Sequence, residues 1–91
     1  MAMNTVFLNI DETRMIGALR GASEKLDGAE GEAILDFSSV SRIDPGAVRA
    51  LEELAQVADE KSVRIVLRNE HVDVYKVLKL MKMTRRFSFV N

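Results

Sequence analysis

A cluster of hydroxyl and carboxylate side chains lies between an apolar run and the start of an amphipathic segment. Ser39 and Ser41 supply hydroxyls that could accept a phosphoryl group, and Asp44 supplies a carboxylate that could act as a general acid or base. A catalytic acid needs a second group within hydrogen-bond reach, whereas a helix N-cap needs none. Because Pro45 follows it, Asp44 has the pattern of an N-cap before a first helical proline. We therefore interpret Asp44 as a cap and the serines as turn formers.

The other residue types offer little for catalysis or metal binding. His71 is the only histidine, and no spacing suggests a nucleophile or further ligands beside it. The chain has no cysteine, so neither a disulfide nor a cysteine-based zinc site is available. No glycine-rich phosphate-binding string occurs. The sequence therefore predicts no catalytic residues, no bound metal and no cofactor, and a protein that is not an enzyme.

Basic residues gather near the C-terminus, where the segment 76–91 has five of them and no acid. Lys76, Lys79 and Lys82 recur every three residues, so they follow one side of a predicted helix. A solvated helix face explains this pattern, and a docking surface for an acidic protein partner is the alternative. Nucleic-acid sites usually add exposed aromatic side chains, and Tyr75 is the only candidate here, so we expect no nucleic-acid binding.

Composition predicts that the whole chain, residues 1–91, forms one domain. Its hydrophobic share of 47% is sufficient for a packed core. A charged share of 30% with a net charge of −1 excludes a disordered acidic chain and a broadly basic nucleic-acid binder. No apolar run approaches the roughly 18 residues of a membrane span, so we expect no membrane insertion. The N-terminus lacks the features of a signal peptide, which predicts a cytoplasmic location.

Hydrophobic periodicity predicts the elements that position these side chains. Runs rich in β-formers predict four strands, at residues 5–10, 33–37, 63–67 and 87–90. Apolar positions at helical spacing predict three helices, over residues 15–26, 45–60 and 72–83. The order β-α-β-α-β-α-β predicts an α/β fold, a layered domain with a mostly parallel four-stranded sheet and helices packed on it. Right-handed crossovers would place successive helices on the same side of the sheet.

The same periodicity predicts which side chains are buried. The helix over residues 72–83 should turn Val74, either Val77 or Leu78, and Met81 inward. The predicted core consists of Leu35, Phe37, Ile43, Leu51, Leu54, Ile65, Leu67, Leu78 and Phe87.

The segment from Asp36 to Asp44, DFSSVSRID, resembles the central motif of the STAS domain, the family of bacterial anti-sigma-factor antagonists. The spacing into the following apolar helix also matches this motif. Residues 67–69 and 77–87 resemble the second half of the family, so the resemblance covers about residues 5–91. It implies a STAS-like fold and a role in signal transduction and transcription regulation.

The resemblance departs from the family pattern at the N-terminus. STAS domains usually begin with two strands that form a hairpin before the first helix, and this chain has room for only one. The missing strand would leave an exposed sheet edge, which is a route to a homodimer.

A second departure concerns phosphorylation. In signalling members of the family, an anti-sigma factor that is also a kinase phosphorylates a serine at the start of this helix. Without a gap, the resemblance places Gly46 at that acceptor position, Pro45 at the serine before it and Ala47 at the glycine after it. A one-residue gap would instead align Gly46 with the family's glycine, and the acceptor would still be absent. Because neither Gly46 nor Pro45 has a hydroxyl, phosphate transfer at the usual site is impossible. Ser39 and Ser41 are the possible substitute acceptors, and as turn formers we expect them to stay unmodified.

The resemblance further implies a protein-binding surface around the start of the second helix. Arg49, one turn along, should point outward and pair with a carboxylate of the partner through bidentate bonds. Lys76 and Lys79 would make secondary contacts. The predicted partner-binding residues are Ser39, Ser41, Asp44, Pro45, Gly46, Ala47 and Arg49.

Three functions fit these expectations. The first is a regulator that sequesters an anti-sigma factor or a related switch kinase. The second is an accessory subunit bound to the ATPase of a bacterial ABC-type lipid transporter, a role that stand-alone STAS proteins also have. The third is a small carrier of an apolar ligand, because related βα folds hold lipids. The sequence alone does not name the partner.

Overall fold

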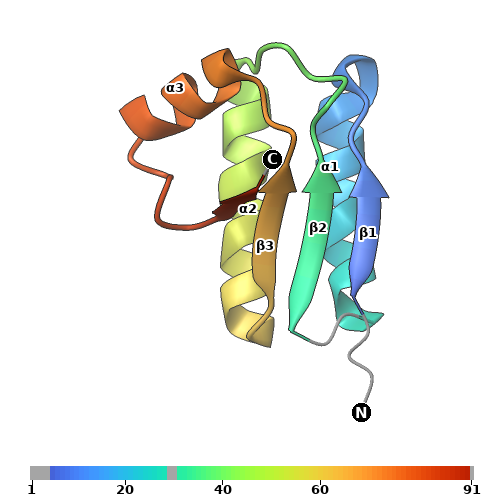
Figure 1. Cartoon of the computed structure of the whole chain (residues 1–91). Helices are drawn as coiled ribbons and strands as arrows, with labels where there is room; N and C mark the ends of the chain where they lie inside the picture. The colour runs from blue at the N-terminus through green and yellow to red at the C-terminus, as the bar shows by residue number, and fades with distance from the viewer. Residues whose placement is uncertain (1–4, 29–30, 91) are drawn as a thin grey trace.

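Strands and helices alternate along the chain in the computed structural model, which describes residues 5–28 and 31–90 (Figure 1). Each strand begins and ends within one residue of its predicted bounds, and the predicted α/β fold is confirmed. The predicted domain limits at residues 1 and 91 lie outside the described residues. In chain order the elements are β1 (Val6–Asn9), the 3₁₀ turn η1 (Glu12–Arg14), α1 (Met15–Lys25), η2 (Leu26–Gly28), β2 (Glu32–Asp36), α2 (Pro45–Lys61), β3 (Arg64–Arg68), α3 (Val72–Leu80) and β4 (Ser88–Val90).

The strands form one parallel sheet in the order β1-β2-β3-β4. Parallel neighbours need a crossover between them, and each crossover here contains a helix. In Figure 1, α1 and α2 both lie behind the sheet, on one face, as right-handed crossovers predict. The third helix, α3, lies near the carboxyl end of the sheet, beside the first turns of α2.

The core lies between this face of the sheet and the two long helices. Eight of the nine predicted core residues are buried; the exception, Ile43, is half-buried. Ile43 precedes α2 in a loop and lines the grooves on either side of that loop, so it has fewer neighbours than a residue between sheet and helix. Alternation along β2 shows the layering, because Ala33 and Leu35 are fully buried while Ile34 between them is not.

Helix α2 begins as its sequence predicts. The Asp44 carboxylate accepts a hydrogen bond from the Ala47 amide at 2.8 Å, and Pro45 occupies the first helical position. The apolar stripe of this helix is buried against the sheet and α1, with Leu51 fully buried. The helix ends at Lys61, and Ser62 caps it in a left-handed conformation that lets the Val63 amide donate to the carbonyl of Ala58.

Helix α3 ends at Leu80, three residues earlier than predicted, and Met81 is 54% exposed, so the prediction that Met81 packs inward is wrong. Lys82 has a left-handed backbone with φ 59°, and across this turn the Met83 amide donates to the carbonyl of Leu78. The turn brings Met83 into the core, where it is 3% exposed. Burial of the Met83 side chain therefore stabilises the fold more than continuation of the helix to Met83 would.

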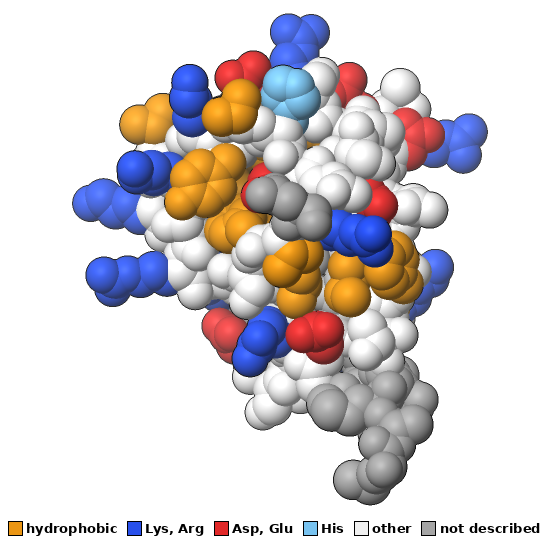
Figure 2. All heavy atoms as spheres, viewed as in Figure 1, with side chains coloured by type: hydrophobic (Ala, Val, Ile, Leu, Met, Phe, Trp, Pro, Cys, Tyr) orange, Lys and Arg blue, Asp and Glu red, His pale blue; other side chains and the backbone are white. Residues whose placement is uncertain are grey.

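The second face of the sheet has no helix over it among the described residues, and Figure 2 looks onto it. An apolar band crosses its middle, with charged side chains above and below the band. We call this surface the open sheet face. Strand alternation and register assign to it Phe7, Glu32, Ile34, Asp36, Arg64, Val66 and Arg68. No described helix has both the length and the apolar character needed to cross a lipid bilayer.

Candidate partner-binding surface

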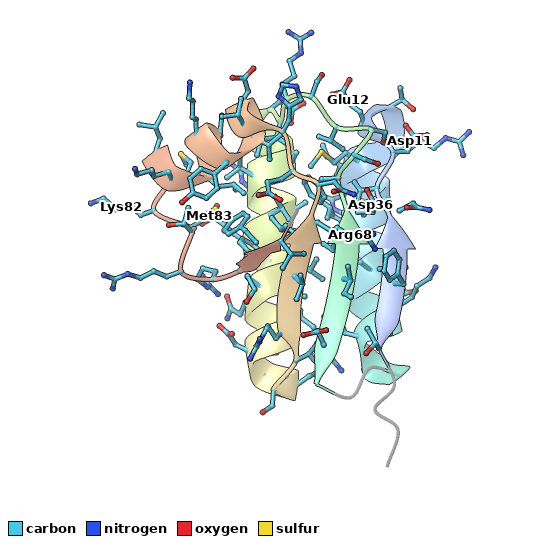
Figure 3. The ribbon with its side chains drawn as sticks, viewed as in Figure 1. Asp11, Glu12, Asp36, Arg68, Lys82 and Met83 are labelled. Atoms are coloured by element: carbon cyan, nitrogen blue, oxygen red, sulfur yellow. The ribbon has the colours of Figure 1, made fainter. Side chains whose placement is uncertain are left out.

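The loop that joins β2 to α2, residues 37–44, passes the carboxyl end of the sheet and leads to the start of α2 (Figure 3). At its beginning, the Asp36 carboxylate accepts a hydrogen bond from the Ser38 amide at 2.8 Å. At its middle, Val40 is 1% exposed and anchors the loop in the core. The loop is therefore fixed by local polar bonds and by a buried side chain, which positions the first turn of α2.

Both serines predicted at the partner surface bond to the segment that follows β1. The Ser39 hydroxyl donates to the Ile10 carbonyl at 2.7 Å. The Glu12 carboxylate accepts from the Ser41 amide at 2.7 Å, from the Ser41 hydroxyl at 2.9 Å and from the Arg42 amide at 3.3 Å. These bonds give both serines a structural role, which agrees with their interpretation as turn formers. Sequence reasoning missed Glu12, because no local pattern marks a bond between residues 29 positions apart.

Hydrogen bonds from the loop lower the pKa of two carboxyl groups. The Ser41 amide, then the Ser41 hydroxyl and the Arg42 amide, lower the pKa of Glu12. The Ser38 amide and hydroxyl lower the pKa of Asp36, with a smaller contribution from the charge of Arg68. Each bond favours the charged form of its acceptor, so the loop is held most firmly when both groups are ionised.

Three of the four predicted contact residues in the first turn of α2, Asp44, Pro45 and Gly46, are exposed. Ala47 is 2% exposed, so its side chain lies in the core and not at the predicted contact surface. A Cβ atom added at Gly46 would lie 3.0 Å from Cδ1 of Ile16 in α1. This atom is the end of a flexible side chain, so a small shift of Ile16 would admit a small side chain at position 46.

A groove with a volume of about 300 Å³ lies beside this turn, between α2 and α3. We call it the α2–α3 groove. Ile43, Val48, Val77 and Met81 give it apolar walls, and Arg49 at its rim is exposed, as predicted. The complete lining is Ile43, Asp44, Pro45, Val48, Arg49, Glu52, Val77 and Met81. Sequence reasoning missed this groove because it placed Met81 in the core.

The basic residues of the C-terminal part separate into two groups. Lys76 and Lys79 are exposed on α3 and make no ion pair with another described residue. Arg86 instead pairs with Asp59 of α2, with a nitrogen–oxygen distance of 3.2 Å. Lys79 and Lys82 line a second, basic depression together with Thr84 and Arg85. Neither Lys76 nor Lys79 lines the α2–α3 groove, and their secondary contacts with a partner stay a prediction.

The other residues considered for chemistry are not assembled into a site. His71 is exposed, and its Nδ1 lies 4.0 Å from the Asp73 carboxylate. Among residues 5–28 and 31–90, no group of three or more histidine, aspartate or glutamate side chains could hold a metal ion. Asp44 is engaged with the Ala47 amide as a cap.

Comparison with known proteins identifies the family to which this arrangement belongs. The family model of the STAS domain matches residues 6–91. No protein with curated annotation matches the sequence. Among solved structures, the chain is similar to a candidate anti-sigma factor antagonist from Thermotoga maritima, with a TM-score of 0.71 and 12% sequence identity over 99% of this chain and 85% of that one. At this identity the likeness shows the fold alone, whereas the family model spans nearly the whole sequence. The chain therefore belongs to the STAS domain family.

Proposed function

We propose that this STAS domain is a non-enzymatic protein-interaction module of the anti-sigma-factor antagonist kind. It binds an anti-sigma factor, or a related switch kinase, through the start of α2 and the α2–α3 groove. The observation that carries this proposal is the exposed first turn of α2 with a groove beside it. The resemblance to the family places Gly46 of this turn at the acceptor position. The partner is a cytoplasmic protein, and we place this domain in the same compartment.

The surface has the composition of a protein-binding site. Its centre is apolar, formed by Val48, Val77 and Met81, and a single guanidinium lies at the rim. Interfaces gain most from desolvated apolar centres and use arginine to set orientation. An apolar side chain of the partner would enter the groove while a partner carboxylate pairs with Arg49.

The proposed module acts without being phosphorylated. Gly46 has no hydroxyl, and the hydroxyls of Ser39 and Ser41 already donate to Ile10 and Glu12. A kinase would have to break these bonds to reach either serine. Binding should therefore not respond to ATP, and the protein would act as a constitutive antagonist.

The test is to incubate the protein with a kinase-type anti-sigma factor and ATP and to measure its intact mass. The matched variant is Gly46→Ser, which restores the acceptor at a position where only the end of Ile16 must shift. We expect the wild-type mass to stay unchanged and the variant to gain one phosphoryl group. A phosphoryl group on wild-type Ser39 or Ser41 would contradict the proposal.

Partner identity is tested separately by binding assays with purified anti-sigma factors and with the ATPase of a lipid transporter. Binding of an anti-sigma factor that disappears in Arg49→Glu would support the proposed role. Binding of the transporter ATPase alone would favour the accessory-subunit role instead. Co-purified lipid without either protein would favour an apolar-ligand carrier.

A further inference from the structure

We infer that the open sheet face is a dimer interface whose occupant is a second copy of this chain. This surface lies across the sheet from the core and does not include the residues of the α2–α3 groove. Phe7 on it is 50% exposed. An apolar sheet face bounded by charged residues is typical of an interaction surface.

The charges on this face are arranged in rows set by the strand register. Paired residues of parallel neighbours point to the same side of the sheet. Glu32 of β2 pairs with Arg64 of β3, so one row has a negative and a positive side chain side by side. At the other end, Asp36 of β2 pairs with Arg68 of β3, and the order of charge is the same. In both rows β2 supplies the acid and β3 supplies the base.

Between these two rows lies an apolar row. Phe7, Ile34 and Val66 are aligned across β1, β2 and β3. The Arg68 guanidinium lies over the Phe7 ring, 5.6 Å from its centre, so it reaches across the face from β3 to β1. The row between the charges is therefore apolar, with Phe7 exposed, Ile34 half-buried and Val66 buried. In both charged rows the acid lies on β2 and the base on β3, and the exposed Val90 of β4 lies beside Arg68.

This pattern is complementary to itself in one orientation. A two-fold axis parallel to the strands, between β2 and β3, places β2 of each copy against β3 of the other. Glu32 then faces Arg64 of the second copy. Asp36 lies opposite Arg68 of the second copy, and this pair forms when the Arg68 guanidinium leaves the Phe7 ring of its own chain. In the apolar row Ile34 lies opposite the second copy's Val66, which is only 5% exposed, so Ile34 supplies most of this contact. Sheets that stack face to face keep their strands within about 30° of each other, which this arrangement permits.

The alternative two-fold axis, perpendicular to the strands, is disfavoured by the same charges. It would place Glu32 against Asp36 of the second copy and Arg64 against Arg68 of the second copy. Like charges across an interface are repulsive and exclude wrong orientations. The register therefore selects the parallel arrangement.

A pair of charge-reversal variants tests this interface. In Glu32→Arg both positions of the row are positive, and in Arg64→Glu both are negative, so each variant repels its own copy. Mixed together, they place opposite charges at both contacts. Sedimentation velocity of the full chain should show a reversible wild-type dimer that high salt weakens. Each variant alone should dissociate about tenfold or more readily, and the equimolar mixture should recover the heterodimer.

The control variant is Arg20→Glu, an exposed reversal on α1, which should dimerise as the wild type does. Ile34→Thr changes the apolar row and neither charge row, and it should weaken the dimer, which guards against a variant of Glu32 that fails to fold. A wild-type chain that stays monomeric at roughly 1 mM would overturn the inference. Single charge-reversal variants that dimerise as the wild type does would also overturn the inference, because an edge-to-edge dimer through β1 would behave in this way. Folded variants whose equimolar mixture stays monomeric would overturn it as well.

Discussion

The carboxylate of Glu12 accepts hydrogen bonds from both the amide and the hydroxyl of Ser41, at 2.7 and 2.9 Å. Glu12 follows β1, and Ser41 lies in the loop that follows β2. The Glu12 side chain therefore joins the segments that leave two neighbouring strands. The partner-binding surface proposed above begins at Ile43, two residues after Ser41. Its position therefore depends on an acid that does not itself belong to that surface.

The first prediction concerns acid stability. The pKa of Glu12 is lowered in the folded state by its hydrogen bonds to Ser41 and Arg42. Its contribution to the free energy of unfolding is therefore complete above its ordinary pKa of 4.5 and is lost as pH falls through its folded-state pKa. Glu12→Gln should therefore be less stable than the wild type at pH 7, and the difference should shrink in acid. Urea denaturation at a series of pH values measures this. Glu24→Gln, an exposed change on α1, is the control, and equal pH profiles for the wild type and Glu12→Gln would contradict the prediction.

The second prediction concerns the partner. Arg49→Glu should weaken binding of the anti-sigma factor by more than about tenfold with folding intact, because it replaces an attraction by a repulsion. Reversal of Lys76 and Lys79 should change mainly the association rate and its dependence on salt. Surface plasmon resonance at two salt concentrations separates these effects. If Lys76→Glu abolishes binding while Arg49→Glu binds normally, the interface lies on α3 and not at the start of α2.

A third prediction concerns the core. Leu51→Ala removes a fully buried side chain from α2 and should lower the free energy of unfolding by about 2–5 kcal/mol. Ile43→Ala should cost less, since Ile43 is only half-buried at the edge of the α2–α3 groove. Urea unfolding followed by circular dichroism gives both values. The assignment of Ile43 to the edge of the core fails if the two losses are equal.

The end of α3 supplies the fourth prediction. Lys82 occupies the left-handed position of a Schellman motif, in which its amide donates to the Lys79 carbonyl. Glycine adopts this conformation without a Cβ clash, so Lys82→Gly should raise stability by about 1 kcal/mol. Lys79→Gly, inside the helix, should lower it by about 1 kcal/mol. Thermal unfolding measures both, and loss of stability in Lys82→Gly would show that its side chain stabilises the turn.

Sequence reasoning succeeded where the controlling interactions are local. The Asp44 cap depends on an amide three residues away, and strand alternation repeats every two residues, so both are visible in a short window. The bounds of α2 and of all four strands were predicted for this reason. The family motif around Asp36 extended the inference to the fold, which the structure confirms.

The features that were missed depend on packing between distant segments. The Glu12–Ser41 bond joins residues 29 positions apart. The end of α3 is decided by burial of Met83, although the local sequence favours a longer helix. The α2–α3 groove exists because that early end exposes Met81 beside Ile43. No pattern within one helix or strand contains this information.

The order of strands in the sheet has a consequence for synthesis on the ribosome. Because β1, β2, β3 and β4 lie in the sheet in the order in which they are translated, each new strand adds to an edge that already exists. No strand must insert between two others, and α1 and α2 can cover three paired strands before α3 and β4 emerge. The sheet can therefore grow vectorially with the nascent chain, and the start of α2 is in place before the residues that complete its groove.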